Sequence, residues 1–487
     1  MRRALLLILD GAGWRTERHG NAVTAEHLPT LFRRIDEHGV AVLEASGEAV
    51  GLEAGQVGNS EAGHLTIGAG RVVPAMARRL LVAHRDGSWV ADPGWERLRA
   101  HGVVHLVGLV SDAGVHGLLR TIHHAAASAA RAGVPDIVVH PVLDGVDSPA
   151  GTAPVLLREL LSELVPVPGV RVGVIQGRRP VCDRSGDLSI SRGVVHALLG
   201  RTHLPAYSDL ALARHLARAS EASFPPHLCT DGPHLRPGEP VLLTSHRADR
   251  ARQLATVLAE TQPLFALVDL GKGVPVEHVF FPQRPLERGL FSELKRAGIA
   301  SLRVAESCKF PHVTFFLNGF DAGAEGQGLC LDSIPEAEIP ARPEMSAAAV
   351  TTEIVRALAD PARRAVIANL ANLDQVGHLG DVPLAQRAAA EVERSFVRIS
   401  DAARTHGWTV FVTSDHGNAD TLIGPDGRPF GSHSESPVPF VVQPAPGSTL
   451  RWSRRQGSLA NVAATYLDAL GLERPEWMEP PLLRLQA

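Results

Sequence analysis

The sequence predicts an α/β protein, because short aliphatic runs alternate with amphipathic stretches along the chain. Residues 4–9 form an uninterrupted aliphatic run, which is typical of a strand buried on both faces of a parallel sheet. Acidic residues follow three of the expected strands: Asp10, Asp374 after a short loop, and Asp415. In open α/β sheets ligands bind at the carboxyl ends of the strands, so these acidic residues indicate where a site would lie.

The same alternation places the individual elements. Pro29 in the first turn favours a helix over residues 28–38, and aliphatic runs alternate with helical patterns from there onwards. Strands are expected at residues 4–9, 103–110, 137–143, 170–175, 241–244, 312–317, 365–370, 408–414 and 439–442. Helices are expected at residues 28–38, 118–131, 153–164, 249–258, 346–358, 383–403 and 459–470.

The chain has 487 residues, which is long for one domain. Breaks occur at Pro74 and at residues 282–285. If Asp10, Asp374 and Asp415 are to share one sheet edge, the two ends of the chain must belong to the same domain. We therefore expect residues 1–73 and 285–487 to form one discontinuous domain, with residues 74–284 inserted as a second α/β domain.

The composition excludes several partners and compartments. A formal net charge of −4 gives no electrostatic footprint for nucleic acid or for an anionic membrane. The four cysteines are widely spaced and form no C-x-x-C pair, which favours a reducing compartment. The aliphatic run at residues 4–9 stops too early for a signal peptide, and no stretch approaches a membrane span. We expect a cytoplasmic monomer.

Ser60 lies in a polar, glycine-rich stretch, VGNSEAGH, at residues 57–64. A serine at a loop-to-helix junction can expose its hydroxyl, and the neighbouring backbone N–H groups can bind an anion. Gly-Asn-Ser is also a common turn composition, so this stretch alone favours an ordinary loop. A catalytic role for Ser60 therefore depends on whether other residues converge on it.

Three more clusters carry side chains of the kind that bind metals: an Asp-x3-His pair, an adjacent Asp-His pair at a strand end, and a histidine in a polar loop. Each alone is also explained by a capped or salt-linked pair. Oxygen and nitrogen ligands of this mixture favour manganese or zinc over calcium, and seven of them are enough for two divalent ions. The seven candidates are Asp10, Ser60, Asp374, His378, Asp415, His416 and His433.

A pair of divalent ions lowers the pKa of a bound hydroxyl and neutralises charge on a phosphoryl group in transfer. This chemistry would make Ser60 a nucleophile towards phosphorus. The sequence thus predicts metal-dependent phosphoryl transfer.

These segments together resemble cofactor-independent (2,3-bisphosphoglycerate-independent) phosphoglycerate mutases of the alkaline phosphatase superfamily. The resemblance spans nearly the whole chain and rests on LILDGAG at 7–13, GNSEAGH at 58–64, the pair at 374–378, SDHGNA at 414–419, and His433. It implies an alkaline-phosphatase-like α/β sandwich with the inserted domain. It also implies that one metal is held by Asp374, His378 and His433, and the other by Asp10, Ser60, Asp415 and His416.

The resemblance further implies an isomerase that converts 3-phosphoglycerate to 2-phosphoglycerate through a phosphoserine at Ser60. The inserted domain would be a substrate-binding phosphotransferase domain that closes over the serine. Manganese is the expected metal, with zinc or cobalt as alternatives, and no organic cofactor is implied. By the same resemblance, Lys309 bridges the phosphate near the metals. The remaining substrate contacts would be Arg247 and Arg250 to the phosphate, and His116, Asp147, Arg178 and Arg184 to the glycerate portion.

Guanidinium groups suit this task, because their planar fork binds carboxylate and phosphate bidentately. Any single arginine in such an arginine-rich chain is also explained as solvated surface. Lys309 is harder to dismiss, since it is one of only three lysines.

Val146 departs from the family pattern, which has an arginine at this position between Gly145 and Asp147 to bind the substrate carboxylate. The sequence after it, SPAGT at 148–152, and the residues after Arg184, SGDLS at 185–189, also lack the expected basic and aromatic residues. Loss of one charged hydrogen bond costs about 1.5–3 kcal/mol of binding free energy. Arg179 or Arg192 are candidates for compensation.

Three functions follow. The first is the phosphoglycerate mutase itself. The second is a diverged mutase or phosphohydrolase acting on another small phosphoester or phosphonate in specialised metabolism, which Val146 favours. The third, a non-catalytic metal-binding protein, does not explain why all seven ligand positions are filled.

Overall fold

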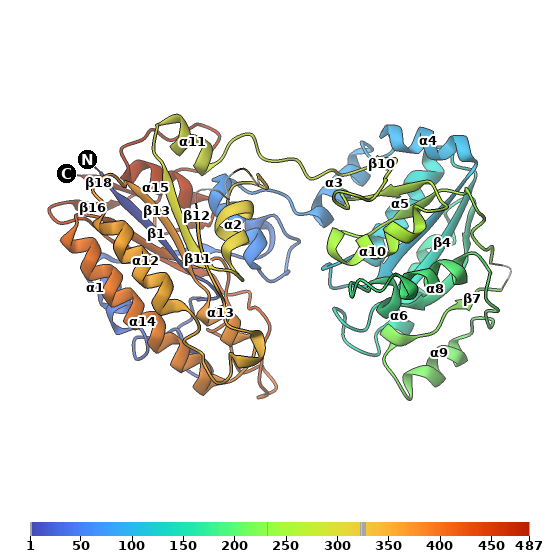
Figure 1. Cartoon of the computed structure of the whole chain (residues 1–487), viewed down its shortest axis with the longest axis horizontal. Helices are drawn as coiled ribbons and strands as arrows, with labels where there is room; N and C mark the ends of the chain where they lie inside the picture. The colour runs from blue at the N-terminus through green and yellow to red at the C-terminus, as the bar shows by residue number, and fades with distance from the viewer. Residues whose placement is uncertain (1, 231, 322, 324–327, 487) are drawn as a thin grey trace. The chain divides into compact units, whose positions relative to one another are not determined.

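The computed structural model describes residues 2–486, except residues 231, 322 and 324–327. The chain divides into two compact units (Figure 1). Unit 1 comprises Met1–Ala75 and Arg284–Ala487, and unit 2 comprises Met76–Gln283. None of the helices formed by the described residues is both long enough and apolar enough to cross a membrane.

Unit 1 is built on an eight-stranded sheet in the order β12-β11-β13-β1-β14-β15-β2-β17. The strands from β12 to β14 are mutually parallel, whereas β15 is antiparallel to both of its neighbours. The strands are β1 (Ala4–Leu9), β2 (Val40–Glu44), β11 (Ser301–Glu306), β12 (Gly328–Leu331), β13 (Ala365–Leu370), β14 (Thr409–Thr413), β15 (Val438–Gln443) and β17 (Gln456–Ser458), together with a separate pair, β16 (Thr449–Trp452) and β18 (Leu483–Gln486).

Helices cover both faces of this sheet, and α1, α12 and α14 lie together on one of them (Figure 1). The longer helices are α1 (Pro29–His38), α2 (Ser60–Ala69), α11 (Leu290–Arg296), α12 (Ala347–Ala359), α13 (Asn372–Gly377), α14 (Val382–Thr405) and α15 (Asn461–Ala469). Short turns of helix are η1 (Gly47–Val50), η3 (His312–Phe316) and η5 (Glu336–Glu338).

The position of the central strand β1 between two cores explains its uninterrupted apolar sequence. Leu5, Leu7 and Leu9 pack into the core formed with α12 and α14. Alternate residues of the same strand, including Leu6 and Ile8, pack into the core formed with α11 and α15. A strand buried on both faces needs an apolar side chain at every position.

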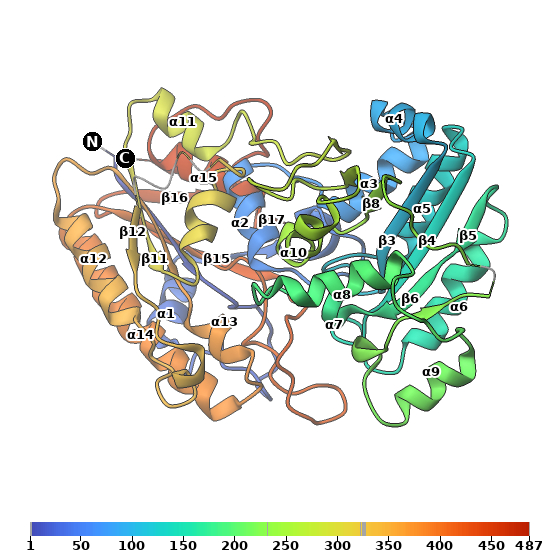
Figure 2. The same cartoon turned by 45° about the vertical axis from the view of Figure 1, so that its right-hand side comes forward.

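Unit 2 has its own sheet, in the order β10-β9-β8-β3-β4-β6-β7, with β5 also paired to β4. The strand pairs among its described residues are parallel except β6 with β7. Strands β3 and β4 lie side by side in this sheet (Figure 2). The strands are β3 (Val103–Val110), β4 (Asp136–Leu143), β5 (Val170–Val172), β6 (Val174–Gly177), β7 (His227–Leu228), β8 (Val241–Leu243), β9 (Leu264–Ala266) and β10 (His278–Val279). The helices are α3 (Met76–Asp86), α4 (Pro93–His101), α5 (Leu119–Arg131), α6 (Ala153–Leu164), α7 (Arg178–Val181), α8 (Leu188–Leu198), α9 (Asp209–Leu216), η2 (Glu221–Ser223) and α10 (Ala248–Leu258).

One strand prediction is wrong. Residues 312–317 were expected to form a strand, but His312–Phe316 is a π-helical turn. Its aromatic residues Phe315 and Phe316 pack edge to face on each other and on Phe320, so local packing overrides their β propensity. The strand lies upstream instead, as β11. Lys309 follows β11 in a turn, in which the Lys309 N–H donates a hydrogen bond to the carbonyl of Glu306 (2.9 Å).

Glu306 ends β11 as a buried carboxyl whose Oε1 accepts a hydrogen bond from the Ser346 N–H (3.0 Å). Burial raises its pKa to about 7, because the charged form is poorly solvated, and the backbone hydrogen bond only partly offsets this. The folded pKa therefore lies above that of the unfolded chain. Ionisation lowers stability progressively as the pH rises from about 4.3 to 7, and the loss is complete above that range.

We therefore expect Glu306→Gln to be more stable than the wild type at pH 8.5, with a free energy of unfolding higher by roughly 1–3 kcal/mol and a higher unfolding temperature. The difference should shrink as the pH falls towards 4, where the wild-type carboxyl is neutral in both states. Thermal unfolding of metal-stripped protein across this range measures it, with the exposed Glu336→Gln as a control. A constant difference at every pH would contradict the assigned titration.

Candidate active site

The topology of unit 1 brings three acidic residues to one edge of the sheet. Strands β13, β1 and β14 are adjacent and parallel, so their carboxyl ends lie side by side. Asp10 directly follows β1, Asp374 lies in the first turn of α13 after β13, and Asp415 follows β14. All three carboxylates are buried. Burying three like charges together is unfavourable unless cations accompany them.

Asp374, His378 and His433 form the first group. Oδ1 of Asp374 lies 3.4 Å from Nε2 of His378 and 3.2 Å from Nε2 of His433, and the two Nε2 atoms are 3.3 Å apart. The Nδ1 atoms face backbone carbonyls, those of Gly431 (2.8 Å) and Gly58 (2.7 Å) respectively. A carbonyl can only accept, so each neutral ring is protonated at Nδ1 and its Nε2 carries a lone pair.

Two lone pairs and a carboxylate oxygen that point at one another repel unless a proton or a metal ion lies between them. Donation from Nδ1 to a carbonyl is also the usual way in which a metal-binding histidine is oriented. The donor set therefore fits a divalent metal held through Asp374, His378 and His433.

Asp10, Ser60, Asp415 and His416 form the second group, next to the first. Nε2 of His416 lies 3.0 Å from Oγ of Ser60 and 3.5 Å from a carboxylate oxygen of both Asp10 and Asp415. Oγ of Ser60 is 3.4 Å from Oδ1 of Asp10. His416 also links the groups, at 3.8 Å from Oδ1 of Asp374. All seven side chains expected to bind metal therefore converge on one place.

Lys309 supplies the cation at the centre of this cluster. Its Nζ lies 2.7 Å from each of three oxygens, Oδ1 of Asp10, Oγ of Ser60 and Oδ2 of Asp374. Burial alone would lower the pKa of this ammonium, but the surrounding carboxylates outweigh burial and raise it, so the lysine stays charged. The same carboxylates raise the pKa of His416 to about 9, so without a metal this imidazole is charged as well, and two cations face three carboxylates. Two divalent ions would make the cluster positive.

Ser60 is the first residue of α2, and Asn59 caps the helix by accepting a hydrogen bond from the Ala62 N–H (2.9 Å). This places the hydroxyl at the positive end of the helix, where backbone N–H groups favour an anion. Gly63 has to be glycine, since a Cβ there would lie 2.3 Å from the carbonyl oxygen of Asp415. The glycine-rich sequence thus lets α2, which carries Ser60, approach the backbone of Asp415 closely.

Two buried residues of this site escaped sequence reasoning, His64 and Asn369. Nδ1 of His64 lies 2.9 Å from the carbonyl of Ser60 and 3.1 Å from Oδ2 of Asp415. The Asn369 amide donates to Oδ2 of Asp10 (2.7 Å) and lies 3.1 Å from Nε2 of His64. The spacing of four between Ser60 and His64 puts them on one helix face, and this signal could have identified His64. Asn369 lies inside an apolar strand, one residue before its end, and carries no comparable signal.

In unit 2, the residues expected to bind substrate also gather. They lie at or after the carboxyl ends of β3, β4, β6 and β8, and Nε2 of His116 is 4.0 Å from Oδ2 of Asp147. Arg247, Arg250 and Arg184 all approach one carboxylate, that of Asp249. His116 faces the same carboxylate. Sequence reasoning did not assign Asp249 a role, although it lies between the two arginines of the Arg-x-x-Arg pair.

Arg178 is buried and forms hydrogen bonds with two carboxylates of its own unit. Its Nη1 donates to Oδ1 of Asp144 (2.5 Å) and to Oδ2 of Asp147 (2.7 Å). Asp144, which sequence reasoning also passed over, accepts hydrogen bonds from the N–H groups of residues 146, 147 and 148. Arg178 and Asp144 therefore shape the loop that carries Asp147. Val146 lies on the same loop with 65% of its surface exposed.

Comparison with known proteins agrees with this arrangement. Residues 2–474 match the family model described as the Metalloenzyme superfamily. The chain is 35% identical to a 2,3-bisphosphoglycerate-independent phosphoglycerate mutase of Cereibacter sphaeroides, over 97% of each chain. It is 32% identical to 2,3-bisphosphoglycerate-independent phosphoglycerate mutase 1 of Methanosarcina acetivorans, over 98% of this chain and 97% of the relative.

A solved structure agrees as well. The crystal structure of Leishmania mexicana phosphoglycerate mutase at low cobalt concentration matches with a TM-score of 0.77 and 26% identity, covering 100% of this chain and 98% of the other. The α/β fold and the family expected from the sequence are confirmed. The chain belongs to the 2,3-bisphosphoglycerate-independent phosphoglycerate mutases, within the metalloenzyme superfamily.

Proposed function

We propose that this protein interconverts 3-phosphoglycerate and 2-phosphoglycerate by metal-dependent phosphoryl transfer through Ser60. The observation that carries the proposal is the position of Oγ of Ser60, 2.7 Å from Nζ of Lys309 and 3.0 Å from Nε2 of His416. A serine hydroxyl becomes a strong nucleophile when cationic groups stabilise its ionised form. Membership of the mutase family supports the same reaction.

The proposed reaction has two symmetrical transfers. Oγ of Ser60 attacks the phosphorus, so that a serine–phosphorus ester forms while the ester bond of the substrate breaks. The serine proton is balanced by the proton taken up on the hydroxyl released from glycerate. Transfer from phosphoserine to the neighbouring hydroxyl of the same glycerate reverses these steps. Lys309 contributes by donating hydrogen bonds first to the serine oxygen and then to the phosphoryl oxygens.

Two divalent ions would lower the pKa of the serine hydroxyl and neutralise the transferring phosphoryl group when bound. We assign one to Asp374, His378 and His433, and the other to Asp10, Ser60, Asp415 and His416. Manganese is the proposed metal, since carboxylate and imidazole ligands suit it, and zinc or cobalt are compatible with the same donors.

We assign the metal-dependent step to the phosphatase-like domain, residues 1–73 and 285–487, and substrate binding to the inserted phosphotransferase domain, residues 74–284. Arg247 and Arg250 are proposed to bind the phosphate, while the glycerate contacts are His116, Asp147, Arg178 and Arg184. The proposed ligands all come from one chain, so a monomer suffices. We propose a cytoplasmic location, where the four free thiols would remain reduced.

Manganese-loaded wild type should convert 3-phosphoglycerate to 2-phosphoglycerate at ordinary enzyme rates, roughly 1–10³ per second. Ser60→Ala should lose at least about 10⁴-fold in kcat, because the nucleophile is gone, while keeping most of its bound metal. An enolase-coupled assay and metal analysis measure both. Ser453→Ala, at an exposed serine of unit 1, is the control. Formation of 2-phosphoglycerate that persists in Ser60→Ala would mean that Ser60 does not carry the phosphoryl group, whereas release of inorganic phosphate alone would mean that water attacks phosphorus.

A second function is favoured by one observation, the exposed valine at position 146. A pocket with fewer groups that donate hydrogen bonds to a substrate carboxylate suits another small phosphoester or phosphonate. With the same serine and metals, the protein would then be a mutase or a phosphohydrolase for that compound. Phosphate release from such an ester, without mutase turnover, would identify this function.

The variant Val146→Arg distinguishes between the two proposed functions. If a carboxylate binds beside residue 146, the added guanidinium should raise kcat/KM for 3-phosphoglycerate by roughly 10-fold or more. Val165→Arg is the matched control, because Val165 is an exposed valine of the same unit. Equal or lower kcat/KM in Val146→Arg would refute this account of the pocket.

A further inference from the structure

Asp249 lies in the first turn of α10, in the middle of the basic cluster of unit 2. Its carboxylate oxygens are 3.6 Å from Nε of Arg247, 3.7 Å from Nη1 of Arg184 and 3.9 Å from Nε of Arg250. Nδ1 of His116 is 3.9 Å away on another side. One carboxylate therefore faces three guanidinium groups and an imidazole, and these groups come from three separate parts of the unit.

None of these four separations is short enough for a good hydrogen bond. Oδ1 of Asp249, Nε of Arg250 and Nδ1 of His116 are buried atoms that make no hydrogen bond within the described residues. Elsewhere in unit 2, Arg192 and Glu260 close a bidentate pair at 2.5 and 2.8 Å. Asp249 thus acts on Arg250 and His116 through its charge and not through a hydrogen bond.

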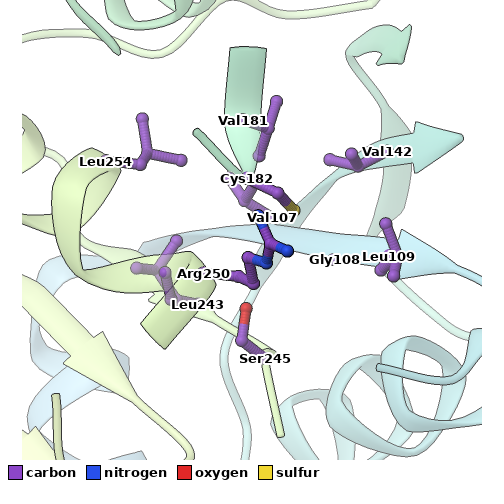
Figure 3. A pocket seen from close by; sticks show the side chains of 11 residues that line it. Val107, Gly108, Leu109, Val142, Val181, Cys182, Leu243, Ser245, Arg250 and Leu254 are labelled. Atoms are coloured by element: carbon purple, nitrogen blue, oxygen red, sulfur yellow. The ribbon is translucent and has the colours of Figure 1, made fainter. Parts of the chain in front are cut away.

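Arg250 also lies beside a small cavity. Its side chain lines a cavity of about 20 Å³ together with Cys182 and Ser245, between apolar residues of the sheet and α10 (Figure 3). A cavity of this size can hold a water molecule. The guanidinium of Arg250 is not held by a hydrogen-bonded pair with Asp249.

We propose that Asp249 is an internal counter-ion that competes with the substrate's phosphate for Arg184, Arg247 and Arg250. This inference rests on the proposed role of Arg247 and Arg250 in binding phosphate. In the empty site the carboxylate holds the three cations together against their mutual repulsion. In the occupied site it repels the phosphate, which weakens binding and speeds release. Asp249 is thus a positioning residue whose charge sets the affinity for phosphate.

The proposal predicts the sign of a charge removal. Asp249→Asn should bind inorganic phosphate about three- to tenfold more tightly than the wild type, because a negative charge a few ångströms from the anion is gone. The KM for 3-phosphoglycerate should fall in parallel without a rise in kcat. The gain should shrink in 1 M salt, where exposed charges are screened. Titration calorimetry of the metal-loaded full chain with inorganic phosphate measures the affinity.

Three variants complete the test. Asp249→Ser also removes the charge and suits a first helical turn, so it should reproduce the tighter binding. Asp249→Glu keeps the charge, and Glu260→Gln removes a carboxylate outside the cluster; both should bind phosphate like the wild type. If the wild type binds phosphate but Asp249→Asn binds equally or more weakly, the counter-ion role is overturned. If neither binds phosphate, the assignment of Arg247 and Arg250 fails as well.

Discussion

The electrostatic repulsion between three buried carboxylates at the edge of one sheet is the constraint on which the rest of unit 1 depends. Asp10, Asp374 and Asp415 repel one another in a medium that solvates charge poorly, and Lys309 neutralises only part of that charge. The histidines around them have their Nδ1 atoms directed at backbone carbonyls, which leaves lone pairs facing inwards. The fold thus holds a cluster of ligands that divalent metal ions would suit.

Much of this arrangement could be predicted from the sequence. The apolar run of β1 shows that its strand is buried on both faces, and polar residues after several strands point to one common edge. The prediction failed where local propensity and packing disagree, as at His312–Phe316, whose aromatic residues turn helical. Asn369 and Asp144 were missed for a different reason. Each binds a side chain that is distant in sequence, Asp10 for Asn369 and Arg178 for Asp144, and no spacing along the chain records such contacts. Only the turn that Asp144 makes with the N–H groups of residues 146–148 is local.

The two units handle anionic chemistry in different ways. In unit 1 the negative ligands and the single lysine lie at contact distance and are deeply buried, which favours strong, directional interactions with metal ions and a phosphoryl group. In unit 2, Arg184, Arg247 and Arg250 are partly exposed and lie around Asp249 at longer separations, which favours reversible capture of an anion. A mutase needs both properties, because the phosphoryl group must be held tightly during transfer and the substrate must be released afterwards.

The central claim is that two metal ions complete the cluster around Ser60. Anomalous diffraction from crystals of the manganese-loaded protein tests this most directly. The account predicts two manganese peaks, one at about 2 Å from Asp374, His378 and His433, and one at about 2 Å from Asp10, Ser60, Asp415 and His416. Fully loaded crystals with manganese bound elsewhere, or with no ion in contact with Ser60, would contradict it.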